Sequence, residues 1–359
     1  MFFGGKGSIG LDIGSSHIKA VKLKEAAGGY ELELFHVHQL PPELIVDGSI
    51  IDSLRLVDAL KNMIKTAGIK AKNAVISVSG HSSVIIKRIS LPEMTEEELS
   101  ESIKFEAEQY VPFDIEDVNL DFQIIGPKEE PGQMDVILVA VKKDIINEYI
   151  SVVKEAGLNP IIVDIGSFAL ENMYGINYEV ASDRNVALLN IGASTVNLII
   201  LKGGISVFTR DSSLGSNLHT EALQREFNIS YENAEKLKSG EPVENVSPED
   251  AMAVIESASE EIFNEIIRSF DYYRSTTVHE DISEVIISGG CSLIGNFVSM
   301  LAERTGIETK IIDPFRNIKI PRKLENAIIA TNDKSYSLND IAPMLAVAVG
   351  LALRRQGDR

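Results

Sequence analysis

The sequence lacks the features of a secreted or membrane-spanning protein. Its single cysteine, Cys291, excludes an intramolecular disulfide and fits a reducing cytoplasm. The longest apolar stretch, residues 342–353, contains Pro343 and Gly350 and is too short to cross a bilayer. Met1–Lys6 contains neither an apolar segment nor a cleavage site, so we expect no signal peptide.

Positive charge is also scarce. The 359 residues include 34 Lys and Arg against 53 Asp and Glu, which gives a net charge of −19. Affinity for nucleic acid, and adsorption to an anionic bilayer, both need basic residues that neutralise phosphates. We therefore expect no nucleic-acid partner and no direct insertion into a membrane. The chain length and the hydrophobic fraction of 44% suffice for two domains or one large two-lobed body.

One stretch near the N-terminus predicts a β-hairpin whose turn approaches a small ligand. Apolar runs flank the turn Asp12-Ile13-Gly14-Ser15-Ser16. Gly14 would let the backbone approach a ligand, and the amides and hydroxyls of the two serines can donate to phosphate oxygens. Asp12 can hold Mg²⁺ through water, and Lys19 can return its ammonium group to the phosphates. The candidate ligand-binding residues here are Asp12, Gly14, Ser15, Ser16, His17 and Lys19.

A second stretch, residues 188–201, has the same form. Asn190 corresponds to Asp12, Gly192 to Gly14 and Ser194 to Ser16. Such a repeat indicates an internal duplication, with a ligand bound between the two halves of the chain. The candidate ligand-binding residues of the second turn are Gly192, Ala193, Ser194 and Thr195.

A third glycine turn follows a predicted strand at residues 285–288. It is predicted to open a helix, which would direct free amides toward a ligand, and its candidate residues are Gly289, Gly290 and Ser292. A single Asp-x-Gly-Ser-Ser turn is more often an ordinary hairpin turn with Asx and Ser hydrogen bonds. Two copies in corresponding places, together with this third turn, favour a ligand site over that alternative.

The remaining pattern predicts strands and helices in alternation, with a small α+β unit inserted in the first half. The predicted strands are residues 30–37, 73–79, 83–90, 118–125, 134–141, 161–165 and 204–209. The predicted helices are residues 56–67, 95–110, 143–156, 167–174, 230–238 and 248–273. Asp340 is expected to cap a last helix, which would run to about Arg354.

Within the inserted unit, Thr95 and Glu98 predict a capping box at the start of the helix over 95–110. The apolar face of this helix is expected to include Leu99, Ile103, Phe105 and Ala107. A turn is predicted at Glu129–Gly132, between the strands over 118–125 and 134–141.

With these residues considered together, the chain resembles the actin-like ATPase superfamily. Its first hairpin resembles the phosphate-one loop, its second hairpin resembles the phosphate-two loop, and Gly289-Gly290 resembles the adenosine loop. Residues 161–168 and 342–353 fall where two connecting helices belong. The resemblance implies an α/β fold of two duplicated lobes around a nucleotide cleft, with ATP and Mg²⁺ as cofactors. It also implies that Glu235 and Lys238, three residues apart on a short helix, hold the adenosine.

The chain departs from the superfamily pattern at two positions. Asn190 stands where Asp is usual, so it would meet Mg²⁺ through water without contributing a charge. Gly215-Ser216 stands where two glycines are common, and Gly215 is counted among the cofactor-binding residues. These departures imply a nucleotide-binding protein with at most slow ATPase activity.

Within the superfamily, the chain is most similar to the PilM family of type IV pilus assembly. The stretch from Leu91 to Phe113 resembles that family's inserted subdomain. Related FtsA proteins end in a basic amphipathic helix, and we expect none after Arg354 and Arg355, which favours PilM. The implied domains are a first lobe of residues 1–79, 158–187 and 341–359, an inserted α+β subdomain of residues 80–157 and a second lobe of residues 188–340.

The resemblance also implies a partner, the cytoplasmic N-terminal peptide of a PilN-type inner-membrane protein. This partner would hold the protein in the cytoplasm, at the inner face of the cytoplasmic membrane. We expect the inserted unit, together with the body on which it packs, to carry the partner groove, with Tyr110, Val111 and Phe113 as candidate contacts. Packing inside the unit is the alternative for each of these three residues, and self-association is left open.

Two other functions are compatible with this superfold. The first is a filament-forming protein related to FtsA. The second is a small-molecule kinase, which needs a catalytic carboxylate, and Asp164 is the only candidate near the expected γ-phosphate. The fold alone does not decide among these functions.

Overall fold

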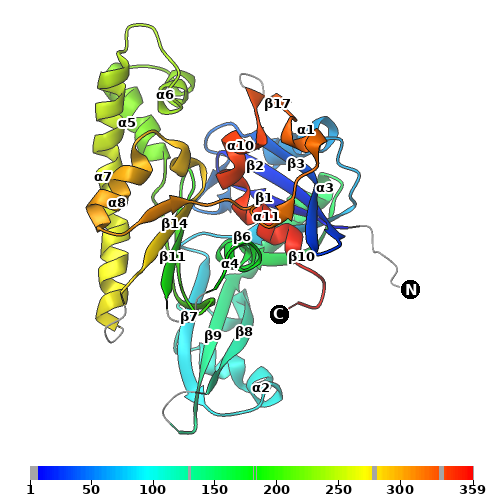
Figure 1. Ribbon diagram of the computed structural model, residues 1–359. Helices are drawn as coiled ribbons and strands as arrows, with labels where there is room; N and C mark the ends of the chain where they lie inside the picture. Colours follow the sequence, from blue (N-terminus) through cyan, green and yellow to red (C-terminus); the bar gives the residue numbers. More distant parts are fainter. Residues whose placement is uncertain are drawn as a thin grey trace.

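The computed structural model describes residues 7–127, 131–180, 182, 184–276, 281–330 and 335–358. Two large sheets stand side by side with helices on their outer faces, and a small three-stranded sheet projects from their base (Figure 1). The expectation for Met1–Lys6, and the first part of the turn predicted at Glu129–Gly132, fall outside the described residues. Within these ranges, no helix has the length and apolar character that a membrane span requires.

The first sheet has six strands in the order β10-β6-β1-β2-β3-β16. Strands β1, β2 and β3 are antiparallel neighbours, whereas β6 pairs in parallel with both β1 and β10. The short β16 comes from the second half of the chain and pairs with β3. The strands are β1 (Ile9–Ile13), β2 (His17–Ala26), β3 (Gly29–Gln39), β6 (Asn73–Val78), β10 (Asn159–Ile165) and β16 (Ile318–Lys319).

The second sheet repeats this arrangement. Its order is β13-β12-β11-β14-β15, with β11, β12 and β13 antiparallel and with β14 parallel to its neighbours β11 and β15. This order matches β3-β2-β1-β6-β10 strand for strand, so the two halves of the chain share one topology and the predicted duplication is confirmed. The strands are β11 (Asn185–Ile191), β12 (Val196–Lys202), β13 (Ile205–Ser212), β14 (Glu284–Ser288) and β15 (Thr309–Ile311).

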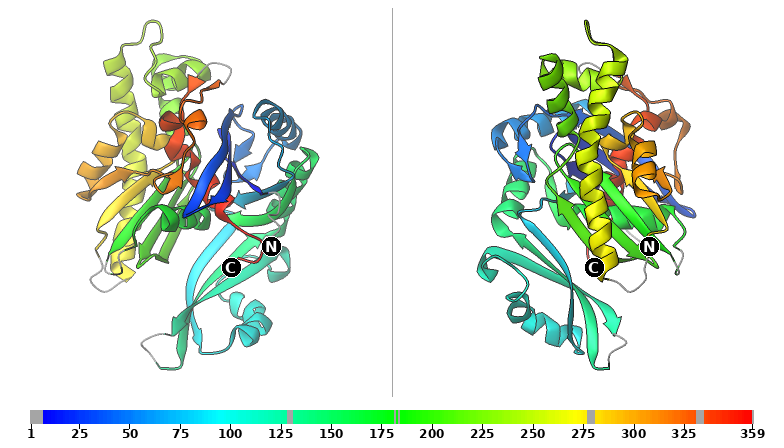
Figure 2. Two further views of the ribbon diagram at one scale, coloured as in Figure 1. Left: turned by 45° about the vertical axis from the view of Figure 1, so that its right-hand side comes forward. Right: turned by 90° about the vertical axis from the view of Figure 1, so that its left-hand side faces the viewer.

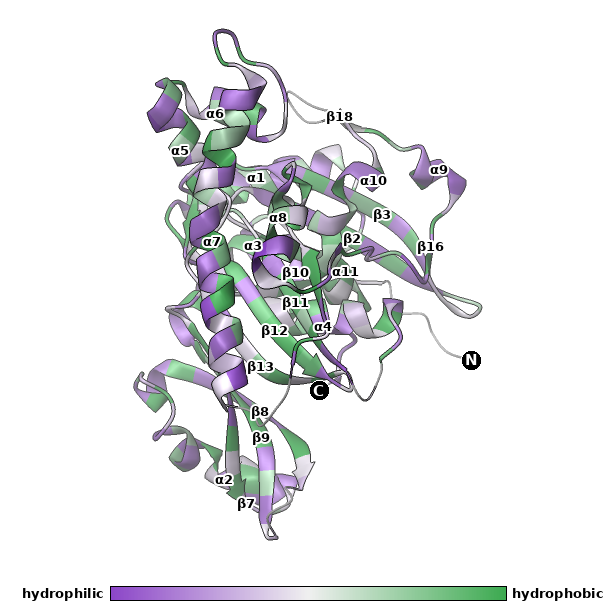
Figure 3. Ribbon diagram, turned by 60° about the vertical axis from the view of Figure 1, so that its left-hand side comes forward, coloured by the Kyte–Doolittle hydropathy of each residue, from purple (hydrophilic) through white to green (hydrophobic). Residues whose placement is uncertain are grey.

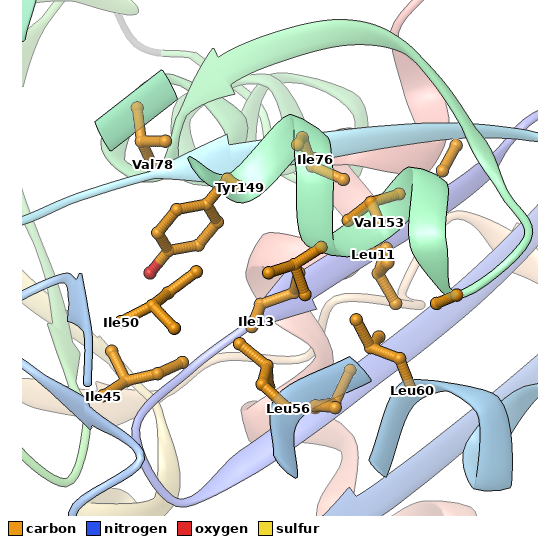
Figure 4. Packing of buried hydrophobic residues seen from close by; sticks show 14 of the residues in the cluster. Leu11, Ile13, Ile45, Ile50, Leu56, Leu60, Ile76, Val78, Tyr149 and Val153 are labelled. Carbon is orange, nitrogen blue, oxygen red and sulfur yellow. The ribbon is translucent and has the colours of Figure 1, made fainter. Parts of the chain in front are cut away.

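Helices α1 (Ser53–Thr66) and α3 (Lys143–Glu155) cover the outer face of the first sheet. Helix α1 begins after Asp52, whose carboxylate accepts from Arg55 N–H at 3.0 Å. Figure 4 shows Leu11 and Ile13 of β1 beside Leu56 of α1 and Tyr149 of α3. Burial of such side chains drives the assembly of this layer.

The outer face of the second sheet is covered by α5, α6, α7 and α8. The longest of them, α7, crosses this face from one end to the other (Figure 2), and hydrophobic and hydrophilic residues are interspersed along it (Figure 3). Its buried residues include Phe263, Phe270 and Tyr273, which join the core of the second sheet. The four helices are α5 (Asn217–Phe227), α6 (Tyr231–Lys238), α7 (Pro248–Thr276) and α8 (Phe297–Thr305).

Two helices, α4 (Gly166–Asn177) and α11 (Ala346–Leu353), cross between the sheets. They touch at Gly350, where a Cβ atom would lie 1.7 Å from the Ala169 carbonyl oxygen. On its other side, α11 meets Gly10 of β1, where a Cβ atom would lie 2.2 Å from the Ala348 carbonyl oxygen. The two lobes are therefore joined by a crossing that leaves no room for side chains at these two positions.

The inserted unit contains an antiparallel sheet in the order β7-β9-β8, with a core of its own. It comprises β7 (Val84–Pro92), α2 (Glu96–Ala107), β8 (Val118–Pro127) and β9 (Gln133–Lys142). The predicted capping box is present, because Thr95 Oγ1 accepts from Glu98 N–H and Glu98 accepts from Thr95 N–H. Helix α3 lies inside the predicted boundaries 80–157 but packs on α1 and the first sheet. The exact division into domains stays a prediction.

The remaining elements are short connections. They are β4 (Ile45–Val46), β5 (Ser49–Ile50), η1 (Ile115–Asp117), η2 (Gly290–Leu293), α9 (Arg322–Glu325), β17 (Ile329–Ala330), β18 (Ser335–Tyr336), α10 (Leu338–Ile341) and η3 (Ala342–Leu345).

Three local predictions were wrong. Asp340 is not an N-cap but the third residue of α10, where its carboxylate accepts from Ser337 N–H at 2.8 Å in a capping box. The predicted last helix is divided into α10, η3 and α11, since Pro343 supplies no N–H to a continuous helix. Phe105 of α2 is 69% exposed and lies outside the apolar face.

Candidate functional site

A cleft of ≈ 360 Å³ lies between the two lobes, at the ends of β1 and β11. The structure brings most of the predicted ligand-binding residues to its walls. Those that line it are Asp12, Gly14, Ser15, Ser16, His17, Lys19, Asn190, Gly192, Ala193, Thr195, Glu235, Lys238, Gly289 and Gly290. Ser194, Gly215 and Ser292 are not among the residues that line it.

The first hairpin contributes an ion pair at one end of the cleft. The β1–β2 register places Lys19 opposite Asp12, and Lys19 Nζ lies 3.0 Å from Asp12 Oδ2. The turn between them is tight, since Gly14 N–H donates to the His17 carbonyl at 3.1 Å. A Cβ atom on residue 14 would lie 2.7 Å from Lys19 Nζ, so glycine keeps the ammonium group accessible.

The second turn is fixed by the start of α5. Ser216 N–H donates to the Gly192 carbonyl at 2.9 Å, and Asn217 N–H donates to the Ala193 carbonyl at 2.8 Å. Gly215 lies directly against this turn, because a Cβ atom there would come within 2.5 Å of the Ala193 carbonyl oxygen. Gly215 thus shapes the loop and does not line the cleft.

The two turns also meet each other. Ser194 Oγ donates to Ser15 Oγ at 2.9 Å, which joins the lobes by a hydrogen bond between residues far apart in the sequence. A ligand bound between the turns would have its polar groups within reach of both hairpins.

The end of the second hairpin holds a residue that the sequence reasoning missed. Asn197 lines the cleft and stands opposite Asn190 in the β11–β12 register. Asn190 Nδ2 donates to Asn197 Oδ1 at 3.2 Å, in the place where the first hairpin has its Asp12–Lys19 ion pair. The signal was available, since Asn197 follows Asn190 by the same seven positions that separate Lys19 from Asp12.

Helix α6 presents Glu235 and Lys238 to the cleft as an ion pair. Both side chains meet Thr220 of α5, whose hydroxyl donates to Glu235 Oε1 at 2.5 Å and accepts from Lys238 Nζ at 2.8 Å. His219 is buried behind them, and this burial lowers its pKa to about 4, so the ring is neutral near pH 7. The pair is therefore held in place by protein contacts before any ligand binds.

The glycine loop after β14 approaches the second hairpin closely. Gly289 has φ +86, and a Cβ atom there would lie 2.3 Å from the Ile191 carbonyl oxygen. Gly290 has no atom near the corresponding position and is open to the cleft. The prediction that Ser292 faces the ligand was wrong, because Ser292 is buried and its hydroxyl donates to the Gly289 carbonyl at 2.7 Å. The helix expected here is a single turn, η2, and α8 begins only at Phe297.

The lining of the cleft also includes apolar and aromatic side chains, which were not predicted. They are Ile294, Tyr336, Met344 and Tyr231. The two hairpins contribute polar side chains, and we call their part of the cleft the polar end. Ser77 and Ser79, at the end of β6, add hydroxyls to the polar end. These residues belong to no local motif, so only the folded chain reveals them.

The donor set at the polar end suits Mg²⁺ that keeps most of its water ligands. Asp12 offers one carboxylate, and Asn190 offers an amide on the opposite side. Within the described ranges, no group of three His, Cys, Asp or Glu residues could form a complete metal cage. Because Mg²⁺ is commonly held by one or two carboxylates together with phosphates, the residues fit such an ion only in the presence of a phosphate ligand.

Asp164 does not take part in this site. Its Oδ2 lies 2.9 Å from Arg354 Nε, and its Oδ1 accepts from Ile165 N–H at 2.8 Å. The side chain is buried and is not among the lining residues of the cleft. A catalytic role for Asp164 is therefore withdrawn, and the residue fastens β10 to the end of α11.

The three candidate partner contacts lie in different environments. Val111 is 6% exposed in the core of the inserted unit, so its predicted place in a groove was wrong. Tyr110 is half-buried against the same core. Phe113 lines a surface hollow of ≈ 370 Å³ together with Lys104, Glu108, Asp114, Ile115 and Glu116.

Comparisons with known proteins agree with this architecture. A chain of a solved PilM-PilN type IV pilus biogenesis complex superposes with a TM-score of 0.82 at 27% identity, over 96% of this chain and 97% of that chain. The ethanolamine utilization protein EutJ from Carboxydothermus hydrogenoformans superposes with a TM-score of 0.58 at 15% identity, over 98% of this chain and 90% of that one. The second match shows a shared fold alone, and together they confirm the predicted actin-like fold.

The family is shown by a sequence model. The model described as type IV pilus assembly protein PilM matches residues 10–356, nearly the whole chain. This match confirms the resemblance inferred from the hairpins and from the inserted segment. The chain belongs to the PilM family of type IV pilus assembly proteins.

Proposed function

We propose that this protein is a nucleotide-binding scaffold of type IV pilus assembly. It binds Mg²⁺ and ATP in the cleft, and it binds the cytoplasmic N-terminal peptide of a PilN-type inner-membrane protein. The observation that carries the proposal is the match over 96% of the chain to a protein solved as a PilM-PilN complex. Through this partner, the protein would act at the cytoplasmic face of the inner membrane.

The chemistry of the cleft supports ATP as its ligand. One end offers Lys19, the Ser15 hydroxyl and the Asp12 carboxylate, which suit phosphates and an accompanying Mg²⁺. The cleft is also lined by Ile294, Met344 and two tyrosines, which suit a flat apolar base. Glu235 and Lys238 line the same cleft and could hydrogen-bond to ribose hydroxyls. A small-molecule kinase is not favoured, since its expected carboxylate, Asp164, is paired with Arg354.

The partner proposal rests on the hollow beside Phe113. The Phe113 ring lies 4.5 Å from Lys142 Nζ, so it is braced on one side and faces the hollow on the other. Glu108, Asp114 and Glu116 give the rim a negative charge. A short peptide with an apolar anchor could place that anchor against Phe113.

A fluorescence titration of a labelled PilN-type N-terminal peptide tests this proposal. We expect Phe113→Ala to weaken peptide binding about tenfold or more, since anchors at the centre of an interface dominate affinity. Phe105→Ala is the matched control, because Phe105 is an exposed phenylalanine of the same unit outside the hollow. Both variants should bind ATP like the unsubstituted protein. Equal peptide binding by all three proteins would place the partner site elsewhere, and no binding by any would contradict the proposed function.

A further inference from the structure

Polar residues form one row across the second sheet where it reaches the cleft. The strand registers place Ser288, Asn190, Asn197 and Asp211 next to one another on β14, β11, β12 and β13. In the first sheet, the position corresponding to Asp211 is Val37, which pairs with Lys19. The carboxylate at the end of the row is therefore specific to the second lobe.

Within this row, side chains donate hydrogen bonds in one order, from Ser288 to Asn190 and from Asn190 to Asn197. Ser288 Oγ donates to Asn190 Oδ1 at 3.3 Å, and Asn190 Nδ2 donates to Asn197 Oδ1 at 3.2 Å. Asn197 Nδ2 makes no hydrogen bond of ordinary geometry, although Asn197 is only 4% exposed. Asn197 lines the cleft, so this buried amide is a donor available to a ligand.

Asp211 stands beside this amide. Burial raises the pKa of Asp211, and the Asn197 side chain, the His81 ring and the Gly80 N–H oppose that effect by favouring the carboxylate. The nearby Asp47 carboxylate adds to the rise. In its ionised form the Asp211 carboxylate accepts hydrogen bonds only, so it would keep the NH₂ side of Asn197 turned toward itself, while the Asn197 carbonyl accepts from Asn190.

The Asp211 carboxylate also lies near Gly80 and His81, the first residues of the inserted unit, which we call its root. Gly80 follows the cleft residues Ser77 and Ser79 and precedes β7, which packs against β13. The root is tightly packed, because a Cβ atom on Gly80 would lie 2.6 Å from the Asp47 carbonyl oxygen. Asp47 Oδ1 accepts from Ser213 Oγ at 2.9 Å and from His81 N–H at 3.3 Å, so this root is joined to the second lobe.

We propose that Asp211 is a positioning residue, which orients the Asn197 amide toward the terminal phosphate of a bound nucleotide and links that contact to the root of the inserted unit. One Asn197 N–H faces Asp211, and the second donates to the phosphate oxygen. This inference rests on the proposed binding of ATP in the cleft. Binding of the terminal phosphate would thereby affect the contacts at Gly80 and His81, where the inserted unit begins.

Calorimetry with ATP and with ADP, each with Mg²⁺, tests the first step. We expect Asp211→Asn to lower ATP affinity about fivefold or more and to leave ADP affinity within about twofold, because one oriented hydrogen bond is lost. Asn197→Ala should show the same selective loss, and the double variant should lose no more than either single variant. Asp250→Asn, at an exposed position in the first turn of α7, is the matched control.

Amide hydrogen exchange at residues 79–84 tests the second step. ATP should slow exchange there in the unsubstituted protein and in Asp250→Asn, but not in Asp211→Asn. If Asp211→Asn binds ATP normally, or if the single losses add in the double variant, the inference is overturned while the proposed function stands. Protection that persists in Asp211→Asn also overturns it. If the unsubstituted protein binds no ATP, the proposed function fails as well. Should Asp211→Asn not fold, unchanged ATP selectivity in Asn197→Ala overturns the inference by itself.

Discussion

Lys19 is a positively charged residue of the first hairpin that lines the cleft. Its ammonium group is held at the polar end by Asp12, 3.0 Å away, and can move to a phosphate when a nucleotide binds. We expect Lys19→Ala to lower ATP affinity about tenfold or more, since a charge-assisted hydrogen bond contributes ~1.5–3 kcal/mol. Lys22→Ala is the control, because Lys22 lies on the same strand and pairs with Glu33. Calorimetry that finds equal affinities would remove Lys19 from the site.

Glu171 of α4 predicts a pH dependence of stability. Burial raises its pKa to about 7 from an ordinary value of 4.5, and a hydrogen bond from the Ser206 backbone only partly opposes this. The folded state thus holds the proton more tightly than the unfolded state, so stability falls as the pH rises from about 4.5 to about 7 and is then flat. Glu171→Gln should remove this loss and add up to ~3 kcal/mol at pH 8. The measurement is urea unfolding of the unsubstituted protein and of Glu171→Gln at pH 5 and pH 8. If the free energy of unfolding changes with pH by the same amount in both proteins, Glu171 is not the cause.

For individual residues, the sequence predicted the lining of the cleft correctly where the motif is local. Asp12 and Lys19 follow from the hairpin pattern, whereas Glu235 and Lys238 follow from the resemblance to the actin-like superfamily. Asp164 and Val111 were misjudged because their environments depend on segments far away in the chain. Ser292 was misjudged because its hydroxyl turns back to the Gly289 carbonyl within its own loop. No local pattern shows that Asp164 meets Arg354.

Among the elements, the crossing of α4 and α11 is the most tightly constrained. A Cβ atom on Gly350 would lie 1.7 Å from the Ala169 carbonyl oxygen, so any side chain would force the helices apart. We expect Gly350→Ala to reduce stability by ~1–3 kcal/mol or more, as overpacking does. A Cβ atom on Gly175 of α4 would meet no atom within 4 Å, so Gly175→Ala should be neutral or stabilise by up to ~1 kcal/mol.

Thermal unfolding of the two variants compares a crowded helical glycine with an uncrowded one. Equal melting temperatures would show that the lobes can separate at the crossing without a measurable cost. A lower melting temperature in Gly175→Ala alone would contradict both expectations, the one for the crowded glycine and the one for the uncrowded glycine.

Element existence was largely predictable, whereas element partners were not. The strand at residues 73–79, the helix at 56–67 and the Thr95 capping box appear close to their expected bounds. Helix α3 follows β9 directly, yet Tyr149 and Val153 join the core formed with α1 and the first sheet. Periodicity shows which face of a helix is apolar but not which core receives it.

For the molecule as a whole, any hydrolysis of ATP in the cleft would depend on charges supplied from both lobes. The first lobe provides Asp12, but the second provides the uncharged Asn190 and Asn197. We expect steady-state phosphate release below ~1 s⁻¹, the low end for enzymes, because half of the charge that would position Mg²⁺ and water is missing. Asn190→Asp should raise the rate. A turnover of many molecules per second by the unsubstituted protein would contradict this expectation.

The duplicated topology was predictable from the sequence because each half repeats its hairpin. The way in which the halves are joined was not predictable. Strand β16, residues 318–319, pairs with the first sheet although it follows the whole second sheet in the sequence. A two-residue strand carries no periodicity, so only its pairing with β3 identifies it.

The contact between Gly10 and α11 has a consequence for how the chain acquires its structure. Among the described elements, β1 is the first in the chain and α11 is the last. The second sheet, by contrast, is built from one continuous part of the chain and can form as soon as that part has left the ribosome. The first lobe must wait with an uncovered inner face until α11 arrives, and contacts of such long sequence separation form slowly. Translation speed and chaperone access during that interval would therefore affect the yield of the first lobe more than that of the second.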